Sequence, residues 1–247
     1  MRTSHSLLVL VFFFFVCCPP FPSTSCCFNI FFFIVVVVVV VALLLLPLLS
    51  RGNPTIVGLD TEWFPDLVPG LFSKTAVLQM CFSQTCIVIS LIHLEGKSGK
   101  LGEILKDGSI FKSGQEVLYD VEKLEDQYGF EVNGVVDLKD IADGCQIPKS
   151  SLFDLYLRVT GEELRKPKKV TRSNWEKWPL TPQQISYGAL DAITSRDVLF
   201  GLHRMYGTEA GGERVSLGEW LRKGEYVLDG KRKSGERSSR YQRERSD

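Results

Sequence analysis

The strongest constraint on the fold is a change of pattern after residue 54, where a long apolar beginning gives way to short β-rich runs. Predicted strands cover residues 55–59, 76–82 and 86–92, and the turn residues Ser83 and Gln84 predict a hairpin between the last two. Strand and helix patterns alternate after the hairpin. Together they predict an α/β domain with a mixed β-sheet flanked by helices.

The second half of the domain is expected to end in a long helix. Thr181-Pro182-Gln183-Gln184 forms a capping box with Pro at the first helical position, and the helix that it opens should run to about Arg204. The other expected elements are short: helices at residues 101–105, 121–128 and 151–159, and strands at 117–119 and 135–136.

The first 50 residues carry one charge, Arg2, and the 20 residues from Ile30 to Leu49 include no charged or polar side chain. About 20 apolar residues cross a hydrocarbon core as a helix, which favours a transmembrane anchor, a membrane partner and a membrane-anchored location. The homopolymeric runs of Phe, Val and Leu favour translated repetitive DNA instead, a gene-model artefact. Without an anchor, the expected location is the nucleus or the cytoplasm.

Composition excludes few functions. The 29 Lys and Arg balance 29 Asp and Glu, so a histone-like polycation is excluded and any nucleic-acid contact must come from local basic patches. Cys81, Cys86 and Cys145 lack CxxC spacing, so we interpret them as reduced and buried rather than as zinc ligands. The predicted organisation is an apolar segment at 1–50, a domain at 51–205 and a disordered charged tail at 206–247.

Four carboxylates and a tyrosine are the candidate catalytic residues. Asp60 and Glu62 stand two residues apart at the end of a predicted strand, so both lie on one face and could hold one cation, although a solvated strand end has the same pattern. Asp120 follows another predicted strand and could instead cap a helix. Asp191 lies in the last helix with Tyr187 one turn earlier on the same face, where an ordinary half-buried aromatic is the alternative.

In order and local context, these five residues resemble the DEDDy family of 3′-5′ exonucleases in the ribonuclease H-like superfamily. The resemblance covers about residues 55–205, with motifs similar to the family's at 58–63, 112–124 and 187–192. The most similar subgroup is the Werner-type exonuclease domains, which include the exonuclease 3′-5′ domain-containing proteins. The resemblance implies a ribonuclease H-like mixed sheet flanked by helices.

The resemblance also implies a reaction, in which DNA or RNA is hydrolysed from a single-stranded 3′ end to nucleoside 5′-monophosphates with two Mg²⁺ or Mn²⁺ ions. Asp60 would bridge both ions, Glu62 and Asp191 would complete the first site, Asp120 would hold the second partly through water, and Tyr187 would orient the attacking water. A catalytically silent nucleic-acid-binding or scaffold module of the same fold is the alternative, but such modules generally lose a carboxylate.

Six residues are candidates for contact with the nucleic acid. Trp63 could stack on a terminal base or pack under the sheet, and packing is favoured. A basic segment just before the third motif could follow a phosphate backbone, although a solvated loop has the same composition. Its members are Arg165, Lys166, Lys168, Lys169 and Arg172. The sequence leaves the oligomeric state and the choice between DNA and RNA open.

Overall fold

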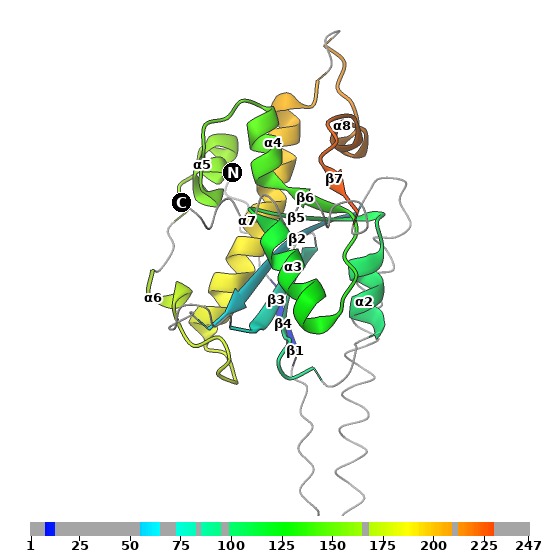
Figure 1. Cartoon of the computed structure of the whole chain (residues 1–247). Helices are drawn as coiled ribbons and strands as arrows, with labels where there is room; N and C mark the ends of the chain where they lie inside the picture. Colours follow the sequence, from blue (N-terminus) through cyan, green and yellow to red (C-terminus); the bar gives the residue numbers. More distant parts are fainter. Residues whose placement is uncertain are drawn as a thin grey trace, which may run out of the picture.

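A mixed β-sheet with helices on both faces forms the centre of the computed structural model (Figure 1). The structure describes residues 8–12, 55–64, 73–82, 85–94, 99–164, 168–208 and 212–229. The seven strands within these ranges lie in the order β1-β4-β3-β2-β5-β6-β7. Their bounds are β1 Leu8–Phe12, β2 Thr55–Trp63, β3 Thr75–Phe82, β4 Thr85–Ser90, β5 Ile110–Gly114, β6 Val135–Asp137 and β7 Val227–Leu228.

The pairing of the strands confirms the predicted mixed sheet. β2, β3 and β4 are antiparallel neighbours, as the predicted hairpin requires. β5 pairs with β2 and β6 pairs with β5 in parallel, and β1 pairs in parallel with β4. β2 therefore lies near the centre of the sheet, between β3 and β5, and the end of this strand carries Asp60 and Glu62.

The helices enclose the sheet in two layers. Their bounds are α2 Gly99–Lys106, α3 Val117–Tyr128, α4 Leu138–Gly144, α5 Leu152–Thr160, α6 Lys168–Thr171, α7 Pro182–Tyr206 and α8 Leu217–Lys223. α7 begins with the predicted capping box, in which Thr181 and Gln184 bond each other's backbone amides. Because this cap fixes where the helix starts, it also fixes which face of α7 presents Tyr187 and Asp191.

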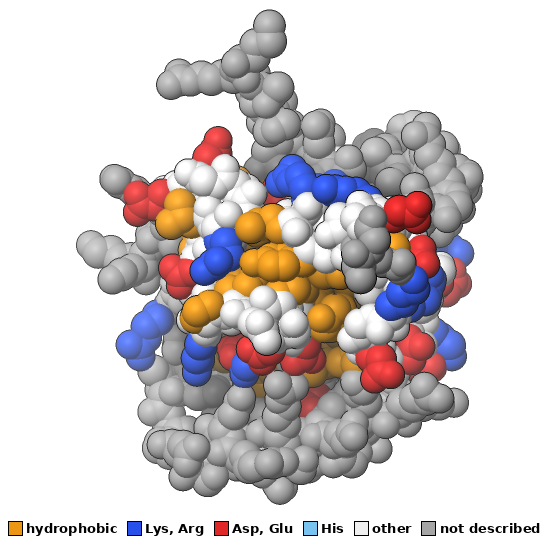
Figure 2. Space-filling view, turned by 90° about the horizontal axis from the view of Figure 1, so that it is seen from above, with side chains coloured by type: hydrophobic (Ala, Val, Ile, Leu, Met, Phe, Trp, Pro, Cys, Tyr) orange, Lys and Arg blue, Asp and Glu red, His pale blue; other side chains and the backbone are white. Residues whose placement is uncertain are grey.

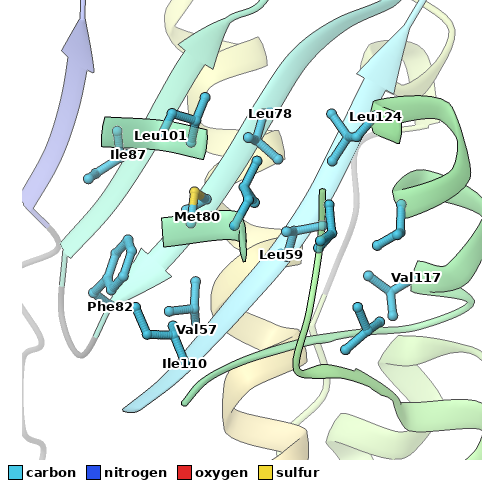
Figure 3. Packing of buried hydrophobic residues seen from close by; sticks show 14 of the residues in the cluster. Val57, Leu59, Leu78, Met80, Phe82, Ile87, Leu101, Ile110, Val117 and Leu124 are labelled. Atoms are coloured by element: carbon cyan, nitrogen blue, oxygen red, sulfur yellow. The ribbon is translucent and has the colours of Figure 1, made fainter. Parts of the chain in front are cut away.

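Apolar side chains attach α2 and α3 to one face of the sheet. Leu59 and Leu78 lie in one buried cluster with Leu101 from α2 and Leu124 from α3 (Figure 3). On the other face, Ala189 and Ala192 of α7 pack against residues of β3 and β4 in a separate cluster. The sheet is therefore held between α2 and α3 on one side and α7 on the other.

The prediction of a strand at residues 117–119 is wrong. The strand in this part of the chain is β5, which ends earlier and whose five residues are all buried, and Val117 begins α3. Glu116, in the left-handed conformation with φ of 54°, separates the two elements. Val117, Val121 and Leu124 are buried at helical spacing, a period that three apolar residues in a row could not show.

The charged tail predicted at residues 206–247 is also corrected. α8 begins at its N-cap Ser216, and β7 pairs antiparallel with β6. Leu221 and Leu228 are buried against the domain, so few apolar residues suffice to fold this Gly- and Arg-rich stretch. The folded domain therefore continues past Met205, and residues 230–247 lie outside the described residues.

The transmembrane helix expected from the sequence is corrected as well. α7 is the longest described helix, and it carries Asp191, Arg196, Asp197 and Arg204. None of the helices that the structure describes combines the length and the apolar character needed to cross a membrane. Residues 30–49, on which that expectation rested, lie outside the described residues.

The prediction that the three cysteines are reduced and buried agrees with the structure in part. Cys81 and Cys86 stand opposite each other in the β3–β4 hairpin as thiols not joined in a disulfide, and both are buried as predicted. Cys145 is free but only half-buried. Burial raises the pKa of the Cys81 thiol to about 12, so this thiol stays protonated at neutral pH.

Candidate active site

Three carboxylates meet where the end of β2 passes α7. One carboxylate oxygen from each of Asp60, Glu62 and Asp191 lies within 4.8 Å of the other two. Asp191 is 4% exposed, and Asp60 and Glu62 are half-buried. The period of the strand puts Asp60 and Glu62 on one face, and α7 brings Asp191 to that face from 129 residues further along the chain.

This group of carboxylates is suited to a divalent cation. All three donors are hard oxygen atoms, which Mg²⁺ and Mn²⁺ prefer. Three carboxylates at this spacing also repel one another when ionised, and a bound cation relieves that repulsion. The side chains that the sequence predicted as a first metal site are therefore brought together by the fold.

Asp120 reaches the same strand from the first turn of α3, but it is not part of the group of three among the described residues. The hydroxyl of Thr61, the residue between Asp60 and Glu62, donates a hydrogen bond of 2.5 Å to Asp120 Oδ1. Burial raises the pKa of Asp120, and nearby Asp137 adds to the increase, whereas the Thr61 hydrogen bond and the Lys123 ammonium oppose it.

Asp137 is a buried carboxylate that the sequence left without a role. It caps α4, and its Oδ1 accepts hydrogen bonds from the backbone amides of Lys139 at 2.9 Å and Glu116 at 3.0 Å. The second bond ties the start of α4 to the turn before α3, whose first turn carries Asp120. Burial raises the pKa of Asp137 to about 6. The only sequence signal for this cap is an Asp directly after a short apolar strand.

Tyr187 lies on α7 one turn before Asp191 and is 2% exposed. Its ring packs beside that of Trp175, with 5.9 Å between the ring centroids. Its hydroxyl oxygen lies 2.7 Å from Thr171 Oγ1, within hydrogen-bonding distance. The predicted pairing of Tyr187 and Asp191 on one helix face is present, whereas no sequence pattern singled out Thr171.

Trp63, at the end of β2 beside Glu62, is fixed by two neighbours from α3. The Lys123 ammonium lies 3.7 Å from the centroid of the Trp63 ring, and the Tyr119 ring meets it edge-on at 5.6 Å. One face of the indole is therefore covered by a cation. The packing interpretation of Trp63 agrees with this contact on one face, and stacking of a terminal base on the ring stays a prediction.

The basic segment before the third motif is described only in part. Lys168 and Lys169 belong to α6, and Arg172 follows this helix with an exposed side chain. Arg165 and Lys166 lie outside the described residues, so their predicted contact with nucleic acid stays a prediction.

Comparison with known proteins decides the family. The sequence model of the 3′-5′ exonuclease family matches residues 47–205. The chain belongs to this family of nucleic-acid hydrolases. A 3′-5′ exonuclease of Arabidopsis thaliana is 35% identical over 145 residues, which are 56% of this chain and 49% of that protein. The bifunctional 3′-5′ exonuclease/ATP-dependent helicase WRN of Mus musculus is 34% identical over 147 residues, 58% of this chain and 10% of that protein.

These curated relatives are longer proteins, and the chain described here spans about half of their length or less. Solved structures show the same fold at lower identity. The EXO domain of Aedes aegypti Nibbler superposes with a TM-score of 0.59 at 16% identity, over 74% of this chain and 89% of that one. Brucella melitensis NrnC with bound Mg²⁺ superposes with a TM-score of 0.54 at 20% identity, over 72% and 82%.

Proposed function

We propose that this member of the family is an active metal-dependent 3′-5′ exonuclease. It hydrolyses phosphodiester bonds at the single-stranded 3′ end of DNA or RNA and releases nucleoside 5′-monophosphates. The observation that carries the proposal is the group of carboxylates formed by Asp60, Glu62 and Asp191, which stand in the family's order and lie within 4.8 Å of one another. A catalytically silent module of the same fold would have no need to keep three mutually repelling carboxylates together.

Two Mg²⁺ or Mn²⁺ ions are part of the proposal. Asp60, Glu62 and Asp191 would hold the first ion, and Asp120 would contribute to the second through water. The bound Mg²⁺ of the Brucella protein of the same fold supports a divalent ion. Such ions, when bound, stabilise charge on the attacked phosphate and the leaving oxygen and lower the pKa of the attacking water.

The side chains of the chain itself supply position. Thr61 holds the Asp120 carboxylate by a hydrogen bond, so this carboxylate is oriented before any ligand arrives. Tyr187 lies one helical turn before Asp191, and the packing of its ring against Trp175 fixes where its hydroxyl oxygen lies. We propose that this hydroxyl orients the attacking water beside the scissile phosphate. A group that positions a reacting molecule must itself be held in a fixed place.

Nucleic acid would be held by local contacts rather than by a basic face. The formal net charge of the chain is zero. The face seen from above carries both acidic and basic side chains around an apolar centre (Figure 2). Arg172 and the lysines of α6 lie just before α7, which carries Tyr187, and are the proposed phosphate contacts. A Trypanosoma brucei RNase D of the same fold has been solved in complex with RNA U12 (TM-score 0.56, 18% identity), which supports a nucleic-acid substrate. The predicted location in the nucleus or the cytoplasm stays a prediction.

The test is degradation of single-stranded DNA and RNA oligonucleotides labelled at the 5′ end, with Mg²⁺ or Mn²⁺. We expect a ladder that shortens one nucleotide at a time, nucleoside 5′-monophosphates as the product, and protection by a blocked 3′ end. Asp60→Asn, purified in parallel, controls for contaminating nucleases. Binding of the oligonucleotide without degradation would support the silent module instead, and internal cleavage would exclude an exonuclease.

A further inference from the structure

We infer that Thr171 is a positioning residue, whose hydroxyl sets the direction in which the Tyr187 hydroxyl points. The inference rests on the proposed function, because it concerns the residue that would orient the attacking water. Thr171 ends α6, and Tyr187 lies in the second turn of α7, so the bond between their hydroxyls connects two separate helices.

Thr171, Trp175 and Tyr187 form a closed set of contacts. The Tyr187 ring packs beside the Trp175 ring. The Trp175 indole Nε1–H donates to the backbone carbonyl oxygen of Thr171 at 3.4 Å, and the Thr171 hydroxyl meets the Tyr187 hydroxyl at 2.7 Å. Because each member touches the other two, the position of the Thr171 hydroxyl is fixed by the same indole that fixes the tyrosine ring.

Packing of the ring leaves one freedom to Tyr187, since a phenolic hydrogen can rotate about the C–O bond after the oxygen has been placed. A neighbour at 2.7 Å removes that freedom in either of two ways. If Thr171 donates, the Tyr187 hydrogen must point away from Thr171, where it can reach water or phosphate; if Tyr187 donates, its oxygen is left to accept from the water. The orientation of the attacking water at this hydroxyl therefore depends on Thr171, which would act only through the Tyr187 hydroxyl.

The test compares Thr171→Val with Thr171→Ser in the full chain. Valine keeps the shape of threonine and removes the hydroxyl, while serine keeps the hydroxyl. We expect Thr171→Val to lower kcat about tenfold without changing KM or the affinity for Mn²⁺ measured by calorimetry. Thr171→Ser should restore most of kcat. The matched control is Thr160→Val at the end of α5, which removes an exposed hydroxyl that donates to the Tyr156 carbonyl and accepts from the Glu162 amide, and it should leave kcat unchanged.

A double-mutant cycle with Tyr187→Phe separates positioning from a general structural role. If Thr171 acts through the Tyr187 hydroxyl, Thr171→Val adds no further loss of kcat when Tyr187 is already Phe. Equal kcat for Thr171→Val and the wild type, or independent losses that multiply in the double variant, would overturn the inference.

A spectroscopic measurement tests the contact without relying on activity. In protein labelled with 3-fluorotyrosine, the ¹⁹F signal of residue 187 is assigned by its loss in Tyr187→Phe. Thr171→Val should shift this signal and leave that of Tyr128 unchanged, since Tyr128 donates to the Thr75 carbonyl elsewhere in the domain. An unshifted signal contradicts the inference even in an active enzyme. If Thr171→Val shifts the signal but the wild-type protein degrades no nucleic acid, the contact is supported and the proposed function is rejected.

Discussion

Gly58 of β2 lies against Ala192 of α7 so closely that a Cβ atom at position 58 would stand 1.7 Å from the Ala192 carbonyl oxygen. One turn earlier on α7, a Cβ at Gly188 would stand 2.7 Å from Nε2 of Gln79, the residue opposite Asp60 in β3. These approaches set the depth at which α7 rests on the sheet. They therefore set the separation between Asp60, two residues after Gly58, and Asp191, one residue before Ala192.

Gly58→Ala should for this reason destabilise the fold and disturb the metal site together. The carbonyl of Ala192 is backbone, so α7 must move away from β2, and we expect a loss of about 3 kcal/mol or more in the free energy of unfolding. Denaturant unfolding measures this loss, and calorimetry with Mn²⁺ measures the weakened binding.

Gly99→Ala at the start of α2 is the matched control. A Cβ at that position meets nothing within 4 Å, so the free energy of unfolding should stay within about 0.5 kcal/mol of the wild type. If Gly58→Ala were as stable as Gly99→Ala, the close approach of β2 and α7 would be refuted.

Asp60→Asn and Asp191→Asn should each abolish nuclease activity without lowering the melting temperature of the metal-free protein. Each change removes a ligand and at the same time removes one charge from three carboxylates whose oxygens lie within 4.8 Å. Mg²⁺ should raise the melting temperature of the wild type and have little effect on either variant, because a ligand stabilises only a state that binds it.

Asp126→Asn, at an exposed site on α3, provides the comparison for these two variants and should behave as the wild type in both measurements. Near-native rates for Asp60→Asn or Asp191→Asn would remove that residue from the proposed metal site. A melting temperature of Asp60→Asn that rises with Mg²⁺ as much as that of the wild type would do the same.

Local patterns explain what the sequence could predict. The period of a strand places Asp60 and Glu62 on one face, and the capping box of α7 fixes the face that carries Tyr187 and Asp191. That these faces meet followed from the family resemblance, because no local pattern encodes a contact across 129 residues.

The contacts that the sequence did not predict join common residue types over long separations. The hydroxyl of Thr61 bonds Asp120 across 59 residues, and that of Thr171 meets Tyr187 across 16. No local sequence pattern distinguishes either threonine from other threonines of the chain. Only the packing of the helices on the sheet brings each hydroxyl to its partner. The end of the domain was missed for a related reason, since α8 and β7 depend on packing against the domain rather than on a strong apolar period of their own.

Tyr187→Phe should lower kcat by a factor on the order of 10² to 10⁴, the range of a lost proton-handling or orienting group. Affinity for Mn²⁺ should be unchanged, because the hydroxyl is not one of the three clustered carboxylate donors. Single-turnover degradation rates and calorimetry check the two halves of this prediction. A large loss of Mn²⁺ affinity would instead show that the hydroxyl supports the shape of the metal site.

The last prediction concerns Lys112, whose side chain is fully buried in β5. Its Nζ donates to the backbone carbonyls of Asp107 at 2.7 Å and Asn133 at 2.9 Å. Burial lowers the pKa of Lys112 to about 7 from 10.5, although the charges of Asp107 and Asp229 oppose the decrease. Between these two pH values the unfolded chain binds more protons at this lysine than the folded chain, so its contribution to stability rises with pH.

Lys112→Met removes this titration and keeps a long side chain, so the variant isolates the contribution of Lys112. The free energy of unfolding of Lys112→Met minus that of the wild type should be largest near pH 6 and should decrease toward pH 9, by at most about 1.4 kcal/mol per pH unit. Subtracting the two free energies of unfolding removes the contributions of the groups that both proteins share. These include the Cys81 thiol and the Tyr128 phenol, because burial raises the pKa of each to about 12.

The control is Lys100→Met, at an exposed lysine paired with Glu103. Its free energy of unfolding relative to the wild type should hardly vary over the same pH range. A difference for Lys112→Met as flat as that for Lys100→Met would mean that Lys112 keeps its charge in the folded protein up to pH 9, stabilised there by the two carbonyl oxygens that its ammonium group contacts.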